Sequence, residues 1–212
     1  MSEYKTEQEV FWAGEFGTDY ISRNKQHTLF ASNLNFFSKA LSRCQSVESV
    51  IEFGANIGLN LKVLELLFPS LEVSALEING DAVKELQKFI PPESVYHSSI
   101  LDFQPQGKTW ELSVVKGVLI HINPDELDGV YETIVNASSR YILIGEYYNP
   151  SPVAIPYRGH TDKLFKRDFA GEIMTKFPNL RLLDYGFAYR NDPVFPQDDI
   201  TWFLLEKPSK RN

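Results

Sequence analysis

A glycine-containing turn that follows one acidic residue and precedes another is the strongest sign of chemistry in the sequence. The apolar run Val50–Phe53 contains Glu52, and the turn Gly54–Gly58 follows directly, ahead of an amphipathic stretch. A strand, a glycine turn and a helix in this order present backbone N–H groups to a nucleotide-like ligand. Glu77 closes the next apolar run, where an acid accepts the two hydroxyls of a ribose. The spacing therefore predicts a site for a cofactor that contains adenosine.

The middle of the turn distinguishes between two such cofactors. Asn56 stands where the dinucleotide fingerprint has its second glycine, the residue that lets the backbone approach a pyrophosphate. S-adenosylmethionine has no phosphate and does not require that approach. The turn therefore favours S-adenosyl-L-methionine, with S-adenosyl-L-homocysteine as the product, and NAD stays the alternative. The residues expected to bind the cofactor are Tyr20, Arg23, Glu52, Gly54, Ala55, Asn56, Gly58, Glu77, Ile78, Ser99, Ile100, Asp102, Lys116, Gly117 and Val118.

Each part of the cofactor has its own expected partners. Glu52 either orders the amides of the turn or meets the amino group of the methionine. The segment 98–103 frames the adenine, and the segment 116–122 lines the methionine moiety. Tyr20 and Arg23 are placed to reach the carboxylate of the cofactor, although an amphipathic packing helix explains the aromatic residues around them equally well.

The elements that must position these residues alternate between strands and helices. Helical stretches are expected over 7–23, interrupted near Gly14 and Gly17, and over 27–43. Five strand–helix units follow, and then two apolar strands joined by a polar, proline-rich turn, which should pair antiparallel. The expected strands are 49–53, 72–76, 95–97, 112–116, 141–146, 180–189 and 201–206, and the expected later helices are 57–67, 80–89, 124–136 and 166–176.

This order predicts one α/β domain over residues 1–212. Short parallel strands with crossover helices give a doubly wound sheet. A seven-stranded, mostly parallel sheet with its last strand antiparallel, helices on both faces and an N-terminal helical lid is the Rossmann-like arrangement of class I S-adenosylmethionine-dependent methyltransferases. Within the domain we expect an N-terminal helical cap (1–45), a cofactor-binding half (46–146) and a substrate loop with the C-terminal antiparallel strands (147–212).

The amino-acid composition argues against several classes of function. A net charge of -7 and 43% apolar residues indicate a globular protein without a basic face for nucleic acid. The single Cys44 excludes an internal disulfide, and the four scattered histidines show no metal-ligand spacing. No stretch resembles a signal peptide or a membrane span, so we expect a cytoplasmic protein without a membrane partner. A monomer and a homodimer both stay open.

Several further motifs resemble one family across nearly the whole chain. They are Phe11–Gly17 (FWAGEFG), Lys116–Pro124 (KGVLIHINP), Glu146–Pro150 (EYYNP), Ile155–His160 (IPYRGH), Lys163–Gly171 (KLFKRDFAG) and Trp202–Glu206 (WFLLE). Together they resemble the pseudaminic-acid-biosynthesis-associated methyltransferases, with no departure at these positions. The resemblance implies a bacterial enzyme encoded with pathways for nonulosonic acids, which are sialic-acid-like sugars. It fixes neither the acceptor nor the methylated atom.

Methyl transfer needs alignment of donor and acceptor and, for some acceptors, removal of a proton. His121 follows the fourth strand and is a candidate base, and the alternative is a loop histidine that caps the helix beginning at Asn123. Glu146 ends the fifth strand and is either the competing base or an anchor for the acceptor. A small sugar substrate is expected beside the long 147–162 loop, and the residues expected to bind it are Tyr147, Tyr148, Asn149, Tyr157, Arg158, His160, Lys163 and Arg167.

Two other functions stay open. A non-catalytic module would bind S-adenosylmethionine without turnover of any pathway intermediate. An NAD-dependent sugar dehydrogenase would bind nicotinamide, but the chain has no clear Tyr-x-x-x-Lys pair for it, since Thr161 stands four residues after Tyr157.

Overall fold

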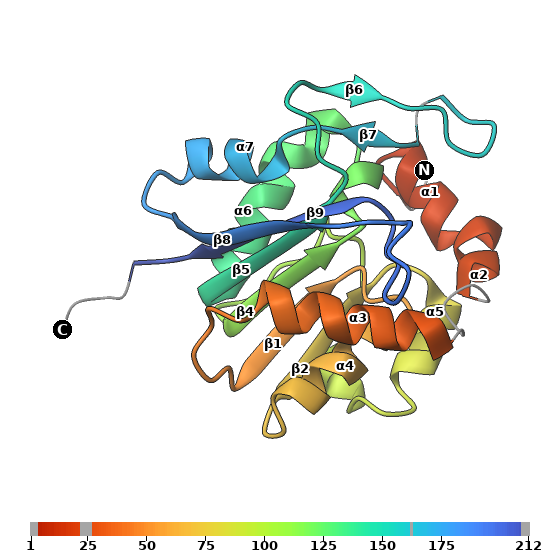
Figure 1. Cartoon of the computed structure of the whole chain (residues 1–212). Helices are drawn as coiled ribbons and strands as arrows, with labels where there is room; N and C mark the ends of the chain where they lie inside the picture. Colours follow the sequence, from red (N-terminus) through yellow and green to blue (C-terminus); the bar gives the residue numbers. More distant parts are fainter. Residues whose placement is uncertain (1–3, 22–26, 162, 209–212) are drawn as a thin grey trace.

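The computed structural model describes residues 4–21, 27–161 and 163–208. Seven strands form one twisted sheet in the order β3-β2-β1-β4-β5-β9-β8 (Figure 1). They are β1 (Ser49–Phe53), β2 (Glu72–Glu77), β3 (Val95–His97), β4 (Trp110–Lys116), β5 (Ser138–Glu146), β8 (Arg181–Ala188) and β9 (Ile200–Glu206).

The last strand is the one that runs against the others. The pairs of β1 with β2 and β4, of β2 with β3 and of β4 with β5 are all parallel. Strand β9 pairs antiparallel with β5 on one side and with β8 on the other. The predicted seven-stranded sheet with an antiparallel last strand is therefore confirmed, and the two C-terminal strands pair as expected.

Helices cover both faces of the sheet (Figure 1). One face carries α3 (His27–Ala40), α4 (Leu59–Leu67) and α5 (Gly80–Leu86), and the other carries α6 (Leu127–Ala137) and α7 (Phe169–Lys176). Two apolar clusters result: Phe37 and Leu64 are fully buried in the first, and Ile134 and Ile173 in the second. Burial of this apolar surface is the main stabilising term of the domain.

The N-terminal segment lies beside the carboxyl ends of the strands rather than on a face of the sheet (Figure 1). It consists of α1 (Glu7–Ala13) and α2 (Glu15–Ile21), separated at Gly14 as predicted. The predicted break at Gly17 is wrong, because Gly17 is a buried residue inside α2. We call α1 and α2 together the lid.

Other boundaries differ from the sequence predictions for local reasons. No helix follows β3: residues 98–109 form turns, and Gln106 and Gly107 there both have positive φ, which a helix does not allow. There are therefore four strand–helix units rather than five. The helix expected from residue 124 starts as a 3-10 turn, η4 (Pro124–Glu126), capped by Asn123, before α6 begins.

The long segment after β5 is partly ordered into a small second sheet. Strand β6 (Val153–Ala154) pairs antiparallel with β7 (Phe165–Lys166). Lys166, the first residue of the expected helix 166–176, therefore belongs to β7. Helix α7 begins only after Asp168, whose carboxylate accepts from the N–H of Gly171. None of the helices in the described ranges is both long and apolar enough to span a membrane.

Candidate active site

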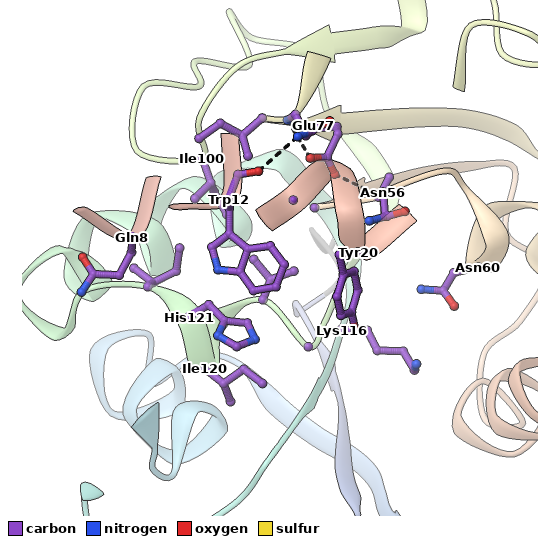
Figure 2. A pocket seen from close by; sticks show the side chains of 18 of the residues that line it. Gln8, Trp12, Tyr20, Asn56, Asn60, Glu77, Ile100, Lys116, Ile120 and His121 are labelled. Carbon is purple, nitrogen blue, oxygen red and sulfur yellow. Dashed lines mark hydrogen bonds between the residues drawn. The ribbon is translucent and has the colours of Figure 1, made fainter. Parts of the chain in front are cut away.

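A cavity of about 720 Å³ opens at the carboxyl ends of β1, β2, β4 and β5, which is where doubly wound sheets bind their ligands. Its walls come from the glycine turn, the ends of β2 and β4, the lid, and the hairpin between β8 and β9. Figure 2 shows Glu77 and Asn56 on one wall of this cavity, Trp12 and His121 on another, and Lys116 below Tyr20.

The glycine turn has the strained backbone that its sequence requires. Gly54, Asn56 and Gly58 all have positive φ, at 70°, 49° and 76°. A Cβ on Gly54 would lie 2.6 Å from Val118, and one on Gly58 would lie 2.4 Å from the ring of Phe89. Gly54, Ala55 and Asn56 line the cavity, whereas Gly58 serves the close packing of α4 on α5 and does not line it.

Glu77 lies at the cavity with its carboxylate already oriented. One oxygen accepts from the backbone N–H of Asn56 at 2.7 Å, and the other accepts from the N–H of Asn79 at 2.8 Å. Burial raises the pKa of Glu77, while the backbone N–H donors, that of Asn79 foremost, act in the opposite direction. The carboxylate joins the end of β2 to the glycine turn and keeps further lone pairs for a ligand.

Glu52 lies behind the cavity wall. Its side chain is 1% exposed, and Asn60 donates to one carboxylate oxygen at 2.6 Å, while the other oxygen has no hydrogen-bond partner among the described residues. A polar chain continues outward, in which Asn33 donates to Asn60 and Gln197 donates to Asn33. Burial raises the pKa of Glu52 to about 8, against the opposing effects of Asn60 and Lys116. Any contact of Glu52 with a ligand therefore acts through Asn60.

The remaining residues expected at the cofactor mostly line the cavity. Tyr20, Ile78, Ser99, Ile100, Lys116, Gly117 and Val118 do so. Asp102 does not, because its carboxylate forms an ion pair with Lys5 at 2.5 Å. Arg23 lies outside the described residues. Burial lowers the pKa of Lys116, whose ammonium lies 5.3 Å from the centre of the Phe36 ring.

His121 occupies the cavity wall within the 3-10 turn η3 (Leu119–His121). Its Nδ1 lies 2.6 Å from the carbonyl oxygen of Lys163, and its ring packs 4.6 Å from that of Trp12 and 5.2 Å from that of Tyr157. Burial lowers its pKa to about 4. A carbonyl only accepts, so Nδ1 carries the proton and Nε2 keeps its lone pair. His121 has the protonation state of a base at neutral pH.

Glu146 does not share this position. Its side chain is 3% exposed and does not line the cavity, because one carboxylate oxygen accepts from the N–H groups of Val118 and Leu119 at 2.9 and 3.0 Å. Burial raises its pKa to about 7, although these backbone donors oppose the shift. Glu146 thus fastens the segment after β4 to the end of β5, and the geometry gives it the role of an anchor instead of the expected base.

The residues expected at the substrate divide into two groups. Tyr147, Tyr157 and Arg158 line the cavity, and Arg158 lies over the rings of Tyr157 and Phe16 at 5.3 and 5.8 Å. The other five expected residues are outside the described cavity lining: Tyr148, Asn149, His160, Lys163 and Arg167.

Other contacts account for all five. The side-chain amide of Asn149 donates to the carbonyl oxygen of Ser151 at 2.5 Å, and the ring of His160 packs 5.2 Å from that of Phe11. The ammonium of Lys163 pairs with Glu7 at 3.2 Å, and the guanidinium of Arg167 pairs with Glu172 at 2.7 Å. Tyr148 packs toward Phe203, with ring centres 6.0 Å apart. These side chains support the walls and the outer face of the sheet rather than the cavity.

Three contributions to the cavity escaped the sequence prediction. Trp12 appeared in the sequence analysis only within the Phe11–Gly17 motif, and Asn79 was not singled out, although an asparagine before Gly80 is typical of a helix cap. The hairpin before β9 was interpreted as a plain turn, yet Gln197 and Asp198 face the cavity. No group of three or more His, Cys, Asp or Glu side chains in the described part of the chain is placed to hold a metal.

Comparison with known proteins identifies the fold to which this arrangement belongs. No protein-family model matches the sequence, and no curated protein matches it. Solved structures do match. Magnesium protoporphyrin IX methyltransferase (ChlM) of Synechocystis PCC 6803, with bound SAM, has a TM-score of 0.65 and 10% identity over 97% of this chain and 100% of that one.

Two other solved structures are similar to the same degree. The plantazolicin methyltransferase BpumL in complex with SAH has a TM-score of 0.64 and 13% identity over 94% of this chain and 93% of that one. DesVI of Streptomyces venezuelae has a TM-score of 0.61 and 12% identity over 97% and 100%. These neighbours do not single out the pseudaminic-acid-associated family. Together with the strand order, they show that this chain has the fold of the class I S-adenosylmethionine-dependent methyltransferases.

Proposed function

We propose that the protein is an S-adenosylmethionine-dependent methyltransferase that acts on a small acceptor. The observation that carries the proposal is Glu77, which lies at the carboxyl end of β2, faces the cavity and is tied to the glycine turn through Asn56. A carboxylate in this position suits a ribose. The cavity volume of about 720 Å³ lies within the range of ~300–1,000 Å³ for small-molecule sites.

The lining residues fit the cofactor in its separate parts. Glu77 holds the ribose, and Ser99 and Ile100 frame the adenine. Lys116 and the amides of the glycine turn accommodate the methionine end. Asn56 fills the place where a pyrophosphate-binding turn needs a glycine, which disfavours NAD. When bound, the cofactor supplies an activated methyl group on a sulfonium, and His121 takes a proton from the acceptor through Nε2.

For the acceptor we propose a nonulosonic acid sugar or its nucleotide-linked precursor. Arg158 supports this choice, because its exposed guanidinium lies at the cavity and has no ion-pair partner among the described residues. A guanidinium binds a carboxylate or a phosphate in bidentate geometry. Tyr147 and Tyr157 also line the cavity, and aromatic rings are surfaces on which a sugar can pack.

Calorimetry tests the cofactor directly. We expect S-adenosylhomocysteine and S-adenosylmethionine to bind the full chain, and Glu77→Gln to weaken both by about 10- to 100-fold, equivalent to ~1.4–2.8 kcal/mol. Glutamine keeps the shape of the side chain and an acceptor for one of the two backbone N–H groups, but it sets an amide donor against the other. The variant therefore measures the loss of the charge together with the loss of one of these hydrogen bonds. Binding of NAD in place of both ligands, or no binding of any of the three, would overturn the proposal.

The acceptor requires a separate experiment. We expect mass spectrometry of nonulosonic acids and their nucleotide-linked forms, incubated with the protein and methyl-labelled cofactor, to show one labelled methyl group on one of them. If the cofactor binds and no such sugar gains the label, the sugar proposal fails while the methyltransferase proposal stands.

A further inference from the structure

Asn79 forms an unusually complete set of contacts directly after the ribose-binding carboxylate. It is 3% exposed, and its backbone N–H donates to Glu77 at 2.8 Å. Its side-chain oxygen accepts from the N–H groups of Asp81 and Ala82, which caps α5. One residue thus joins the cavity wall to the start of a helix.

The other side-chain atom of Asn79 points to the lid. Nδ2 lies 3.3 Å from each of the carbonyl oxygens of Trp12, Ala13 and Gly14, and 3.2 Å from the hydroxyl oxygen of Thr18. The carbonyls at the end of a helix lack partners within that helix. The two protons of a single amide are therefore shared among acceptors at the end of α1 and the start of α2.

An asparagine is needed here only if the lid contact matters. Serine and aspartate cap a helix as well as asparagine does, but neither carries the N–H₂ group that reaches the α1 carbonyls. Gly17 adds an independent fit to the same junction: a Cβ there would lie 1.9 Å from the carbonyl oxygen of Trp12 and 3.0 Å from Nδ2 of Asn79.

The lid in turn builds another wall of the cavity. The Trp12 ring lies 4.6 Å from that of His121 and 5.4 Å from that of Tyr20, and the side chains of all three line the cavity (Figure 2). A displaced lid would remove the packing on one face of His121. The ribose side and the acceptor side of the cavity are therefore both complete only while α1 keeps this position relative to β2.

We propose that Asn79 is a positioning residue that couples Glu77 to the lid, so that cofactor binding and completion of the wall beside His121 are linked. The inference rests on the proposed function, because it takes the cavity as a cofactor site. It assigns Asn79 no contact with the reacting atoms. The contacts of Nδ2 hold the lid against the cavity. The contacts of Oδ1 cap α5 and do not hold the lid.

Asn79→Ser separates these two roles, since serine keeps the cap and loses the donor. Asp168→Ser is the matched control, because it makes the same kind of cap change at α7, away from the cavity. Trp12 is the lid's own fluorophore, and subtraction of the spectrum of Trp12→Phe isolates its emission from that of the buried Trp110 and Trp202. We expect Asn79→Ser to shift the Trp12 emission toward that of an exposed indole.

We also expect Asn79→Ser to weaken S-adenosylhomocysteine binding by about five- to tenfold, since the competent arrangement is populated less. A saturating concentration of S-adenosylhomocysteine should then restore the Trp12 emission. Asp168→Ser should change neither the Trp12 emission nor the affinity for S-adenosylhomocysteine. In Gly17→Ala the added Cβ would clash with the carbonyl group of Trp12 and so displace α1 from α2, while Asn79 itself is unaltered. This variant should reproduce both effects.

Two results would overturn the proposed coupling between Asn79 and the lid. Unchanged Trp12 emission in both Asn79→Ser and Gly17→Ala would overturn the coupling and leave Asn79 as a helix cap. Tighter binding of S-adenosylhomocysteine by Asn79→Ser would overturn it as well, because the lid would then act as a barrier. If the unaltered chain binds no S-adenosylhomocysteine while Asn79→Ser still shifts the emission, the proposed function fails and the tie between Asn79 and the lid holds.

Discussion

Nδ1 of His121 lies 2.6 Å from the carbonyl oxygen of Lys163, a contact between the turn η3, which follows β4, and the segment that leads into β7. The contact fixes the tautomer of the imidazole and keeps the lone pair on Nε2. It also makes the proposed base depend on a part of the chain that follows it by more than forty residues.

His121 should behave as a base that stays neutral over most of the pH range. We expect His121→Gln to lower kcat by about 10²- to 10⁴-fold and to leave the dissociation constant of S-adenosylhomocysteine nearly unchanged. Since burial lowers the pKa of His121 to about 4, its contribution to a pH profile of kcat/KM should be a loss of activity only near that value. An acidic limb at pH 6.5 that disappears in His121→Gln would contradict the buried, neutral imidazole.

Glu52 should make the protein less stable as pH rises. Its pKa in the fold is about 8, above the ordinary value of 4.5, so the folded state binds more protons between these two values. The free energy of unfolding should therefore fall as pH rises from about 4.5 to 8. In urea titrations across this range, Glu52→Gln should have a flatter profile than the unaltered chain.

Glu146 offers an internal comparison for the same measurement. Its pKa of about 7 is raised in the same direction, so Glu146→Gln should flatten the profile only up to about pH 7. If both variants keep the full decline of the unaltered chain, neither carboxylate is the cause of it.

The two glycines Gly58 and Gly129 should respond in opposite ways to alanine. Gly58 has a φ of 76° and lies against Phe89, so Gly58→Ala should lower the free energy of unfolding by about 1–3 kcal/mol. Gly129 lies in α6 with nothing within 4 Å of an added Cβ, so Gly129→Ala should raise it by about 0.5–1 kcal/mol. Thermal unfolding of both variants measures the contrast, and an equal response would contradict the strain assigned to the turn.

Arg158 should matter for the acceptor and not for the cofactor. We expect Arg158→Ala to raise the KM for an acidic sugar by about 10- to 100-fold and to leave S-adenosylhomocysteine binding unchanged. Arg158→Lys should restore only part of the loss, because an ammonium lacks the bidentate fork. Full turnover by Arg158→Ala at low acceptor concentration would remove the main support for an acidic acceptor.

Local sequence patterns were sufficient to predict most of the cofactor-binding half of the domain. The pattern of Glu52, Gly54 and Glu77 is set within one strand–turn–helix unit and the next strand, so its position follows from chain order alone. The antiparallel last strand was also predictable, because no helix separates β8 from β9. The missing helix after β3 was less accessible, since it depends on positive φ at Gln106 and Gly107.

The sequence by itself determined the strands, their succession along the chain and the acid at the end of β2, because apolar periodicity and turn residues act over a few neighbouring positions. Only the tertiary structure decided which polar residues reach the cavity. Glu146 and Arg167 have suitable chemistry but are held by Val118 and Glu172, whereas Asn79 and Trp12 meet across a distance that no local pattern encodes. Side-chain partners at the ends of strands come from distant segments, and their hydrogen bonds and burial form only when the domain is packed.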